Sequence, residues 1–381
     1  MSERIRVLHC LSSVARGGVE RRRVVLAKRL DPTRYEQRVL ARATRGDVVD
    51  ALEEHGVPVM TVGSGRLFAP RPLLRAVSEA VRFRPHIVHG AVFEGLSLAV
   101  TAGNACGARI VIEETSLATT RSPRGRALFR TIVAASDACV AISPAVRDHL
   151  RDIGNIPERK ITLIQNGIDE PVVPPAHELE ATRRELRLSP QAFVVGSVCR
   201  LTDDGVKRVS DLIRASALLR SRCPELRVLV VGDGLARPSL ECLSRELGVE
   251  DCVTFLGNRE DTGRFYALMD VFTLLSSREG FGLVVAEAMF CGVPVVGAAV
   301  GGIKDSVVDG ETGVLVPPFS PEAVAEALLT LSQRPELRLA MGEAGRVRAQ
   351  RLFGAARYAS DVDAFYTRLL DSPRRRLKDM I

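Results

Sequence analysis

Short apolar runs rich in β-branched residues alternate with amphipathic segments along almost all of the 381 residues. The runs have the length of strands, and the segments between them have the spacing of helices. Strands separated by helices pair in parallel and are covered by helices on both faces, so the pattern predicts an α/β fold with doubly wound sheets. The expected strands are residues 5–11, 37–41, 57–62, 86–89, 109–113, 138–142 and 161–164, then 193–199, 226–231, 253–256, 271–275, 293–296 and 314–316.

A proline-rich break divides this pattern into two halves. Residues 170–177 read Glu-Pro-Val-Val-Pro-Pro-Ala-His, and proline removes backbone donors on which helices and sheets depend. We therefore predict two Rossmann-like domains, residues 1–172 and 191–355, joined by a linker at residues 173–190. Open parallel sheets bind ligands at the carboxyl ends of their strands, which predicts a ligand site in a cleft between the domains.

The composition excludes several classes of protein. The N-terminus lacks the charged segment and long apolar segment of an export signal. The apolar runs are far shorter than the roughly 20 residues of a membrane-spanning helix. The eight cysteines are scattered and form no Cys-x-x-Cys pattern. We expect a cytoplasmic protein with reduced thiols and no bound metal.

Arginine gives the chain its net charge of +7, with clusters in residues 21–23, 121–130 and 374–376. The simplest interpretation is that these clusters lie on solvated helix faces. Peripheral contact with an anionic membrane surface, or binding of a polyphosphate ligand, is the alternative. Aromatic residues make up only 4% of the chain and Trp is absent, so the platforms on which bases stack are missing. We predict that the chain binds no nucleic acid.

Paired glycines follow the first expected strand. Gly17 and Gly18 precede a helical pattern, and backbone amides at a helix start can approach a phosphate or a sugar. The G-x-G-x-x-G spacing of a dinucleotide site is absent, and a plain tight turn explains these glycines equally well. His86 and His89 flank a strand end that we expect on the cleft side, where one of them can contact an acceptor or serve as a structural histidine.

Two cations follow the first expected strand of the second half. Arg200 stands at its end, and Lys207 precedes a helical pattern that begins near Arg208. Because a helix start favours anions, two cations there indicate that a diphosphate binds between them. A surface loop in which Asp203 and Asp204 neutralise both cations is equally compatible with the sequence.

Two glutamates, separated by seven residues, surround a glycine-rich turn. Glu279 lies on the turn, and Glu287 lies about a turn and a half into the following helix, among apolar residues. A buried carboxylate costs several kcal/mol unless it is hydrogen-bonded. The vicinal hydroxyls of a ribose are suitable donors, so we predict a nucleotide contact for Glu287 and disfavour a solvent-facing position.

Taken together, these motifs resemble the retaining glycosyltransferases of the GT-B fold, family 4 (group 1). The resemblance implies that the first domain binds the acceptor, that the second binds a nucleotide-sugar donor, and that residues 356–381 pack back on the first. It covers the chain from end to end and rests on Gly17-Gly18-Val-Glu20, residues 84–89, Asn166-Gly-Ile-Asp169, Arg200 with Lys207, Glu279-x7-Glu287, Gly301-Gly302 and Gly310-Glu-Thr-Gly313.

The resemblance also implies a role for each residue. Arg200 and Lys207 hold the donor diphosphate, Glu279 the transferred sugar and Glu287 the ribose, so that Arg200, Lys207 and Glu279 are the catalytic residues. The family reacts by front-face attack with retention, assisted by the departing phosphate, which implies neither a cofactor nor a metal. Backbone amides are expected to contact the donor at Gly17, Gly18, Gly280, Phe281, Gly282 and Leu283.

The chain departs from the family pattern after residues 109–113. Many relatives carry a His there, whereas this chain reads Glu113-Glu114-Thr115-Ser116. We expect His89 or Glu114 to take over part of that role on the acceptor side. The loop between Arg200 and Lys207 is also longer than is usual in the family, and we still expect Lys207 to reach the same phosphate.

The function expected from the resemblance is transfer of a sugar from a UDP-sugar donor to a lipid-linked saccharide. Such a reaction belongs to cell-surface polysaccharide synthesis, with the enzyme at the inner membrane face. The alternatives are a transferase of a small secondary metabolite, a nucleotide-sugar epimerase and a non-catalytic module that binds sugar or membrane. The absence of G-x-G-x-x-G argues against a dehydrogenase.

Overall fold

The computed structural model describes residues 3–15, 17–63, 69–117 and 121–373. It divides into two compact units, with unit 1 formed by Met1–Ile168 and Ala355–Ile381, and unit 2 by Asp169–Gly354. The division falls before the expected linker, and helix α7 (Ala176–Glu185) belongs to unit 2. Its Glu178 and Thr182 accept hydrogen bonds from Arg264, each at 2.9 Å, so a tertiary contact orders a segment whose prolines indicated a linker.

Unit 1 is built on a parallel seven-stranded sheet in the order β3-β2-β1-β4-β5-β6-β7. All seven strands expected in the first half of the sequence are present, because a sheet buried on both faces requires the apolar runs that predicted it. The strands are β1 Ile5–Val14, β2 Tyr35–Thr44, β3 Val59–Thr61, β4 Ile87–Ala91, β5 Arg109–Glu114, β6 Ala138–Ala141 and β7 Ile161–Leu163. The helices are α1 Gly18–Arg29, α2 Val48–Glu53, α3 Pro70–Phe83, α4 Phe93–Cys106, α5 Pro123–Ala134 and α6 Pro144–Asp152, with a 3-10 turn at Glu158–Lys160.

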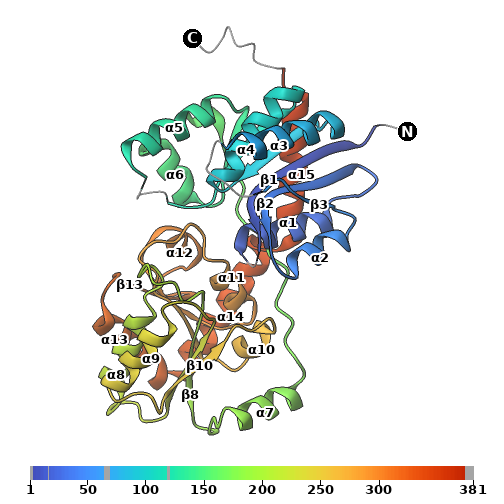
Figure 1. Ribbon diagram of the computed structural model, residues 1–381. Helices are drawn as coiled ribbons and strands as arrows, with labels where there is room; N and C mark the ends of the chain where they lie inside the picture. Colours follow the sequence, from blue (N-terminus) through green and yellow to red (C-terminus); the bar gives the residue numbers. More distant parts are fainter. Residues whose placement is uncertain (1–2, 16, 64–68, 118–120, 374–381) are drawn as a thin grey trace. The chain divides into compact units, whose positions relative to one another are not determined.

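The C-terminal helix α15 (Ala355–Asp371) returns to unit 1 and lies beside α1 (Figure 1). Its buried side chains, including Tyr358, Phe365 and Tyr366, share one hydrophobic cluster with β1 and α1. At its start, the Ala355 amide donates to the Ile168 carbonyl at 2.9 Å. Helix α15 is therefore a part of the first core.

Unit 2 repeats the design with a parallel six-stranded sheet in the order β10-β9-β8-β11-β12-β13. All six strands expected in the second half of the sequence are present. The strands are β8 Phe193–Val198, β9 Leu226–Val231, β10 Val253–Gly257, β11 Val271–Leu274, β12 Val295–Ala298 and β13 Gly313–Val316. The helices that follow α7 are α8 Val209–Leu219, α9 Arg237–Glu246, α10 Thr262–Tyr266, α11 Leu283–Phe290, α12 Gly301–Ser306, α13 Pro321–Gln333 and α14 Pro335–Leu352.

Candidate functional site

Arg200 lies directly beyond β8, at the carboxyl edge of the unit 2 sheet, and is exposed. The neighbouring loop after β9 holds its backbone, because the Leu201 amide donates to the Asp233 carbonyl at 3.0 Å. Gly232 and Gly234, both at positive φ, let these loops approach, and a Cβ at either would collide with a carbonyl oxygen of the Arg200 loop. The Gly-Asp-Gly motif therefore serves close packing behind Arg200.

Lys207 and Glu279 meet at the same edge of the sheet. The Lys207 Nζ lies 2.6 Å from Glu279 Oε2, and the two side chains remain 27% and 17% exposed. The Ser277 amide donates to the Val206 carbonyl at 2.8 Å, which ties the Lys207 loop to the Glu279 loop. Within the loop between Arg200 and Lys207, the Asp204 side chain accepts hydrogen bonds from Thr202 Oγ1 at 2.7 Å and from the Val206 amide at 3.1 Å.

The turn after Glu279 rests on the start of α12. The Gly302 amide donates to the Glu279 carbonyl at 3.0 Å. A Cβ at Gly302 would collide with the backbone of Gly280 and Phe281, so only glycine permits this approach. Gly302 therefore supports the turn that carries Glu279.

Glu287 lies within α11 and is only 6% exposed. Its Oε2 accepts a hydrogen bond from the Tyr266 hydroxyl at 2.8 Å. Tyr266, from α10, thus supplies a hydrogen bond that the sequence analysis expected from a ribose, and it was missed because a strand lies between the two residues in the sequence. The contact of Glu287 with a nucleotide stays a prediction. Gly282 begins α11 at a left-handed φ of 82°, which aims the first amides of the helix, from Leu283 onward, at the same edge.

These elements bring four of the predicted residues to one edge of one sheet. Arg200 follows β8, and Lys207 directly precedes the N-cap residue of α8, where a helix dipole also favours negative charge. Two carboxylates, Glu279 and Glu287, provide acceptors for hydroxyl groups. The arrangement suits a ligand that combines an anionic group with several hydroxyls, such as a nucleoside diphosphate sugar.

Gly17 and Gly18 open α1 in unit 1. Gly17 is the N-cap residue in extended backbone conformation and offers no side-chain cap to the first amides of the helix. A Cβ at Gly17 would collide with the Glu20 carboxylate, which folds back over the helix start. Because this carboxylate is the far end of a flexible side chain that can move aside, the site does not by itself require glycine, and the contact of these amides with a donor stays a prediction.

Glu114 ends β5 and is buried. Its Oε1 accepts from the amides of Thr115 and Ser116, both at 3.1 Å, and its Oε2 lies 2.7 Å from the Arg121 guanidinium. The carboxylate organises the loop at the carboxyl edge of the sheet, where ligands of such sheets bind. A direct contact with an acceptor stays a prediction.

His89 lies in the middle of β4, not at its end, because β4 continues to Ala91 by pairing with β5. His86 precedes β4, at the opposite edge from the expected ligands. The His89 ring is 1% exposed, with Nδ1 2.7 Å from the Tyr366 hydroxyl and Nε2 3.2 Å from Glu113 Oε2. Protein groups face both ring nitrogens, which favours the structural alternative over an acceptor contact.

Two arginines of the cluster 21–23 are buried, and the prediction that they lie on a solvated helix face is wrong for them. Arg22 and Arg23 are 2% and 1% exposed. Both pair with Glu113, at 2.6 and 3.0 Å. The partner lies about 90 residues away on β5, so no local pattern disclosed it. Residues 374–376 lie outside the described part of the chain.

The protonation of this cluster is set by its burial. Burial, reinforced by Arg23, lowers the pKa of His89 to about 4. Burial also lowers the pKa of His9, whose ring lies beside that of His89. Burial alone would raise the pKa of Glu113, but Arg22 and Arg23 outweigh it and hold that pKa well below 4.5. At neutral pH the cluster holds two cations, one carboxylate and neutral imidazoles.

The stability of unit 1 should therefore depend on pH in the range where histidine titrates. Above about pH 6.5 the ring of His89 is neutral in both states, and its contribution to stability is complete. As the pH falls from 6.5 to about 4, the unfolded chain takes up a proton that the folded ring excludes, which costs about 3 kcal/mol. Urea unfolding across this range should show a weaker pH dependence in His89→Gln, and equal dependence in both proteins would contradict the assignment.

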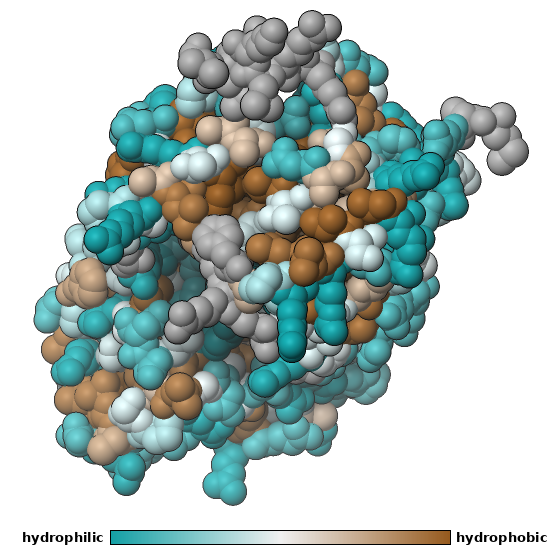
Figure 2. All heavy atoms as spheres, turned by 45° about the horizontal axis from the view of Figure 1, so that its top comes forward, coloured by the Kyte–Doolittle hydropathy of each residue, from teal (hydrophilic) through white to brown (hydrophobic). Residues whose placement is uncertain are grey.

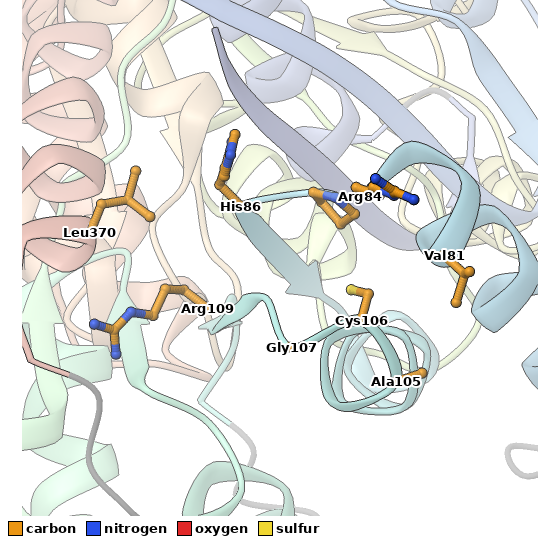
Figure 3. Close-up of a pocket in the computed structure, with 9 residues that line it drawn as sticks. Val81, Arg84, His86, Ala105, Cys106, Gly107, Arg109 and Leu370 are labelled. Atoms are coloured by element: carbon orange, nitrogen blue, oxygen red, sulfur yellow. The ribbon is translucent and has the colours of Figure 1, made fainter. Parts of the chain in front are cut away.

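A cavity of about 630 Å³ lies elsewhere in unit 1, at the amino ends of β4 and β5 (Figure 3). Figure 3 shows His86 and Arg109 at the strand starts and Cys106 at the end of α4. Arg84 and Arg109 stand near the carboxyl ends of α3 and α4, where cations stabilise a helix dipole. Because ligands of open parallel sheets bind at the opposite edge, this cavity is not the candidate site.

Both halves of the chain match sequence models of glycosyltransferases. Residues 16–170 match the model described as Glycosyltransferase Family 4, and residues 179–348 match Glycosyl transferases group 1. The chain is 29% identical to a D-inositol 3-phosphate glycosyltransferase of Thermobispora bispora over 94% of the chain and 91% of that protein. It is 30% identical to the N-acetyl-alpha-D-glucosaminyl L-malate synthase of Bacillus anthracis over 63% of the chain, and the match spans 61% of that relative.

Solved structures share the fold. The complex of Anabaena Alr3699/HepE with UDP-glucose superposes with a TM-score of 0.86 over 96% of the chain and 100% of that chain, at 24% identity. A sucrose-phosphate synthase from Thermosynechococcus elongatus superposes with a TM-score of 0.80 over 96% and 99%, at 23% identity. With two parallel-sheet units and both sequence matches, the chain belongs to the group 1 glycosyltransferases of the GT-B fold.

Proposed function

We propose that the chain transfers a sugar from a UDP-sugar to a saccharide acceptor. The observation that carries this proposal is the meeting of Lys207 and Glu279 at 2.6 Å beside the buried Glu287 helix. In the proposed complex the cations hold the diphosphate, Glu279 accepts from sugar hydroxyls, and Glu287 accepts from the ribose. Support for a uridine nucleotide comes from HepE, which was solved with UDP and with UDP-glucose.

The proposed reaction exchanges one bond at the anomeric carbon. The acceptor hydroxyl attacks C1 of the donor sugar from the face that the diphosphate leaves, so the configuration is retained. The bond from C1 to the diphosphate oxygen breaks, and the hydroxyl proton passes to the departing phosphate. Arg200 and Lys207 stabilise the charge that develops on the diphosphate. The reaction requires no metal, so activity should persist in excess EDTA.

Ribose recognition by Glu287 can be tested by changing protein and ligand together. Glu287→Gln should weaken UDP binding about 10- to 100-fold, because a hydrogen bond to a charged group is worth about 1.5–3 kcal/mol. Binding of 2′,3′-dideoxy-UDP should change less than about threefold, since it lacks the donors, and isothermal titration calorimetry would measure both. Glu343→Gln, an exposed glutamate of α14, is the matched control. Equal losses for both ligands would contradict the role of Glu287.

We propose a lipid-linked saccharide as the acceptor, with the chain at the inner membrane face. A small polar acceptor is the second candidate, because relatives are named for inositol 3-phosphate and for malate. Mass spectrometry of products formed from a UDP-sugar with each acceptor class separates the two. A converted sugar nucleotide in the absence of any acceptor would instead support an epimerase.

The helices described here include none that is both long enough and apolar enough to cross a bilayer. Peripheral contact is the proposal, and helix α3 supports it. Its Leu74 and Val81 are 68% and 53% exposed and lie two turns apart on one face, beside Arg71, Arg75 and Arg82. Figure 2 shows that hydrophobic side chains also reach the surface among hydrophilic ones on the face drawn there.

Membrane contact through α3 should depend on both charge and apolar side chains. The protein should sediment with vesicles that contain phosphatidylglycerol and not with pure phosphatidylcholine vesicles. Leu74→Ser with Val81→Ser should reduce the bound fraction at least about threefold, because two apolar side chains leave the interface. Leu339→Ser, an exposed leucine of unit 2, is the control. Unchanged sedimentation of the α3 variant would contradict this surface.

A further inference from the structure

Two residues with left-handed backbone contact one another next to Lys207. Arg208, the N-cap of α8, has a φ of 52°, and Phe319, in the loop between β13 and α13, has a φ of 60°. The Arg208 guanidinium lies 4.8 Å from the centroid of the Phe319 ring. Residues other than glycine rarely adopt this backbone conformation, whereas glycine would adopt it at either position without strain. Such strain is retained mainly where the surrounding structure serves a function.

The Phe319 side chain is also largely exposed to solvent, which is unfavourable for an aromatic ring. The ring is 61% exposed, so little of it is removed from water in return for the strained backbone. Its described contact is the cation–π interaction with Arg208. The ring therefore acts on the Arg208 side chain more than on the hydrophobic core.

Arg208 is held from its other side by its own helix. Its Nε donates to Asp211 Oδ2 at 2.9 Å, and Asp211 is buried in the first turn of α8. The Asp211 amide in turn donates to the Arg208 carbonyl at 2.9 Å. The guanidinium is thus fixed between a buried carboxylate and an aromatic ring, and the left-handed backbone of Arg208 is fixed with it.

Lys207 lies between two anchored neighbours. On one side, the Val206 carbonyl is bound by the Ser277 amide at 2.8 Å. On the other side, Arg208 is bound by Asp211 and Phe319. The backbone of Lys207 therefore has little freedom, and its ammonium group is directed to Glu279.

We infer that Phe319 and Arg208 are positioning residues, which hold Lys207 where it meets the donor diphosphate. The inference rests on the proposed function, because it assigns a supporting pair to the donor site. Neither residue needs to touch the substrate. They reduce the number of conformations open to the Lys207 side chain before it binds the diphosphate, which is the physical basis of preorganisation.

The decisive variant is Phe319→Gly, because it removes both the ring and the strain. The midpoint of thermal unfolding should stay equal or rise, since glycine favours the left-handed region. UDP affinity should fall about tenfold, because Lys207 loses its fixed position. Phe319→Tyr, which keeps the ring, should retain the affinity of the unmodified protein. Arg187→Gly relieves a φ of 53° elsewhere in unit 2 and should leave UDP affinity unchanged.

A double-variant cycle shows whether Phe319 acts through Lys207. Phe319→Gly should weaken UDP binding in the unmodified protein and have less than a twofold effect in the Lys207→Ala background. Equal losses in both backgrounds, or unchanged affinity in Phe319→Gly alone, would overturn the inference. If the unmodified protein itself binds no nucleoside diphosphate, the proposed function fails before the inference is reached.

Discussion

Lys207→Ala is expected to lower kcat/KM for the donor about 100- to 1000-fold, the loss typical when one preorganised group that stabilises developing charge is removed. Lys207 is the cation nearest to Glu279, at 2.6 Å, so its truncation removes positive charge from the diphosphate and leaves a carboxylate in its place. The remaining Glu279 would then repel the leaving group. Steady-state kinetics with a UDP-sugar, together with UDP binding, measures both consequences.

Matched variants separate the roles of the pair. Arg214→Ala removes an exposed cation from the same helix, α8, and should leave kcat/KM within about twofold. Glu279→Gln should weaken the UDP-sugar more than UDP, because the proposed partner of Glu279 is the sugar. A Lys207→Ala enzyme that retains kcat/KM within threefold, or a Glu279→Gln enzyme equally weakened for both ligands, would refute these assignments.

The sequence disclosed the fold because the determining pattern is local. A strand buried on both faces is mostly apolar, as β8 and β9 are, so each strand could be found from its own residues. The boundary between the units was harder to predict from the sequence. The prolines after Asp169 indicated a linker, whereas α7 is ordered by Arg264, about 80 residues later in the chain.

The candidate site was predictable where its residues lie in one contiguous motif. Glu279, the glycine turn and Glu287 occupy nine consecutive positions, and their order along turn and helix defines their geometry. The partners that complete the site come from distant elements. Tyr266 reaches Glu287 from α10, and Gly302 supports the turn from α12, so both required the assembled sheet.

Buried charge was the least predictable feature, since three consecutive arginines ordinarily indicate a solvated helix. Arg22 and Arg23 instead face the sheet, where Glu113 accepts both. The residues of α1 alone do not indicate that these arginines are buried, because the compensating carboxylate comes from β5 and the surrounding tyrosines come from α15. Whether a charge is buried depends on its partner, and the partner here is non-local.

Glu113→Ala is accordingly expected to destabilise unit 1 by about 3–5 kcal/mol, the cost of removing one partner from a buried ion pair. The variant leaves Arg22 and Arg23 buried with no carboxylate between them, and it also removes the partner of the His89 Nε2. Urea unfolding followed by a probe on unit 1 measures the loss. If this variant does not fold, Glu113→Gln keeps the volume and a hydrogen-bonding group and still removes the charge.

The loss should reflect uncompensated charge and not lost packing, and two further variants distinguish these causes. Replacing the whole cluster, Arg22→Met with Arg23→Met and Glu113→Leu, should recover most of the stability, because apolar side chains of similar volume need no partner. Asp251→Ala breaks the exposed pair with Arg220 and should cost at most about 1 kcal/mol. A triple variant as unstable as Glu113→Ala would mean that packing dominates. Recovery would instead identify charge balance as the term that keeps β5, α1 and α15 together.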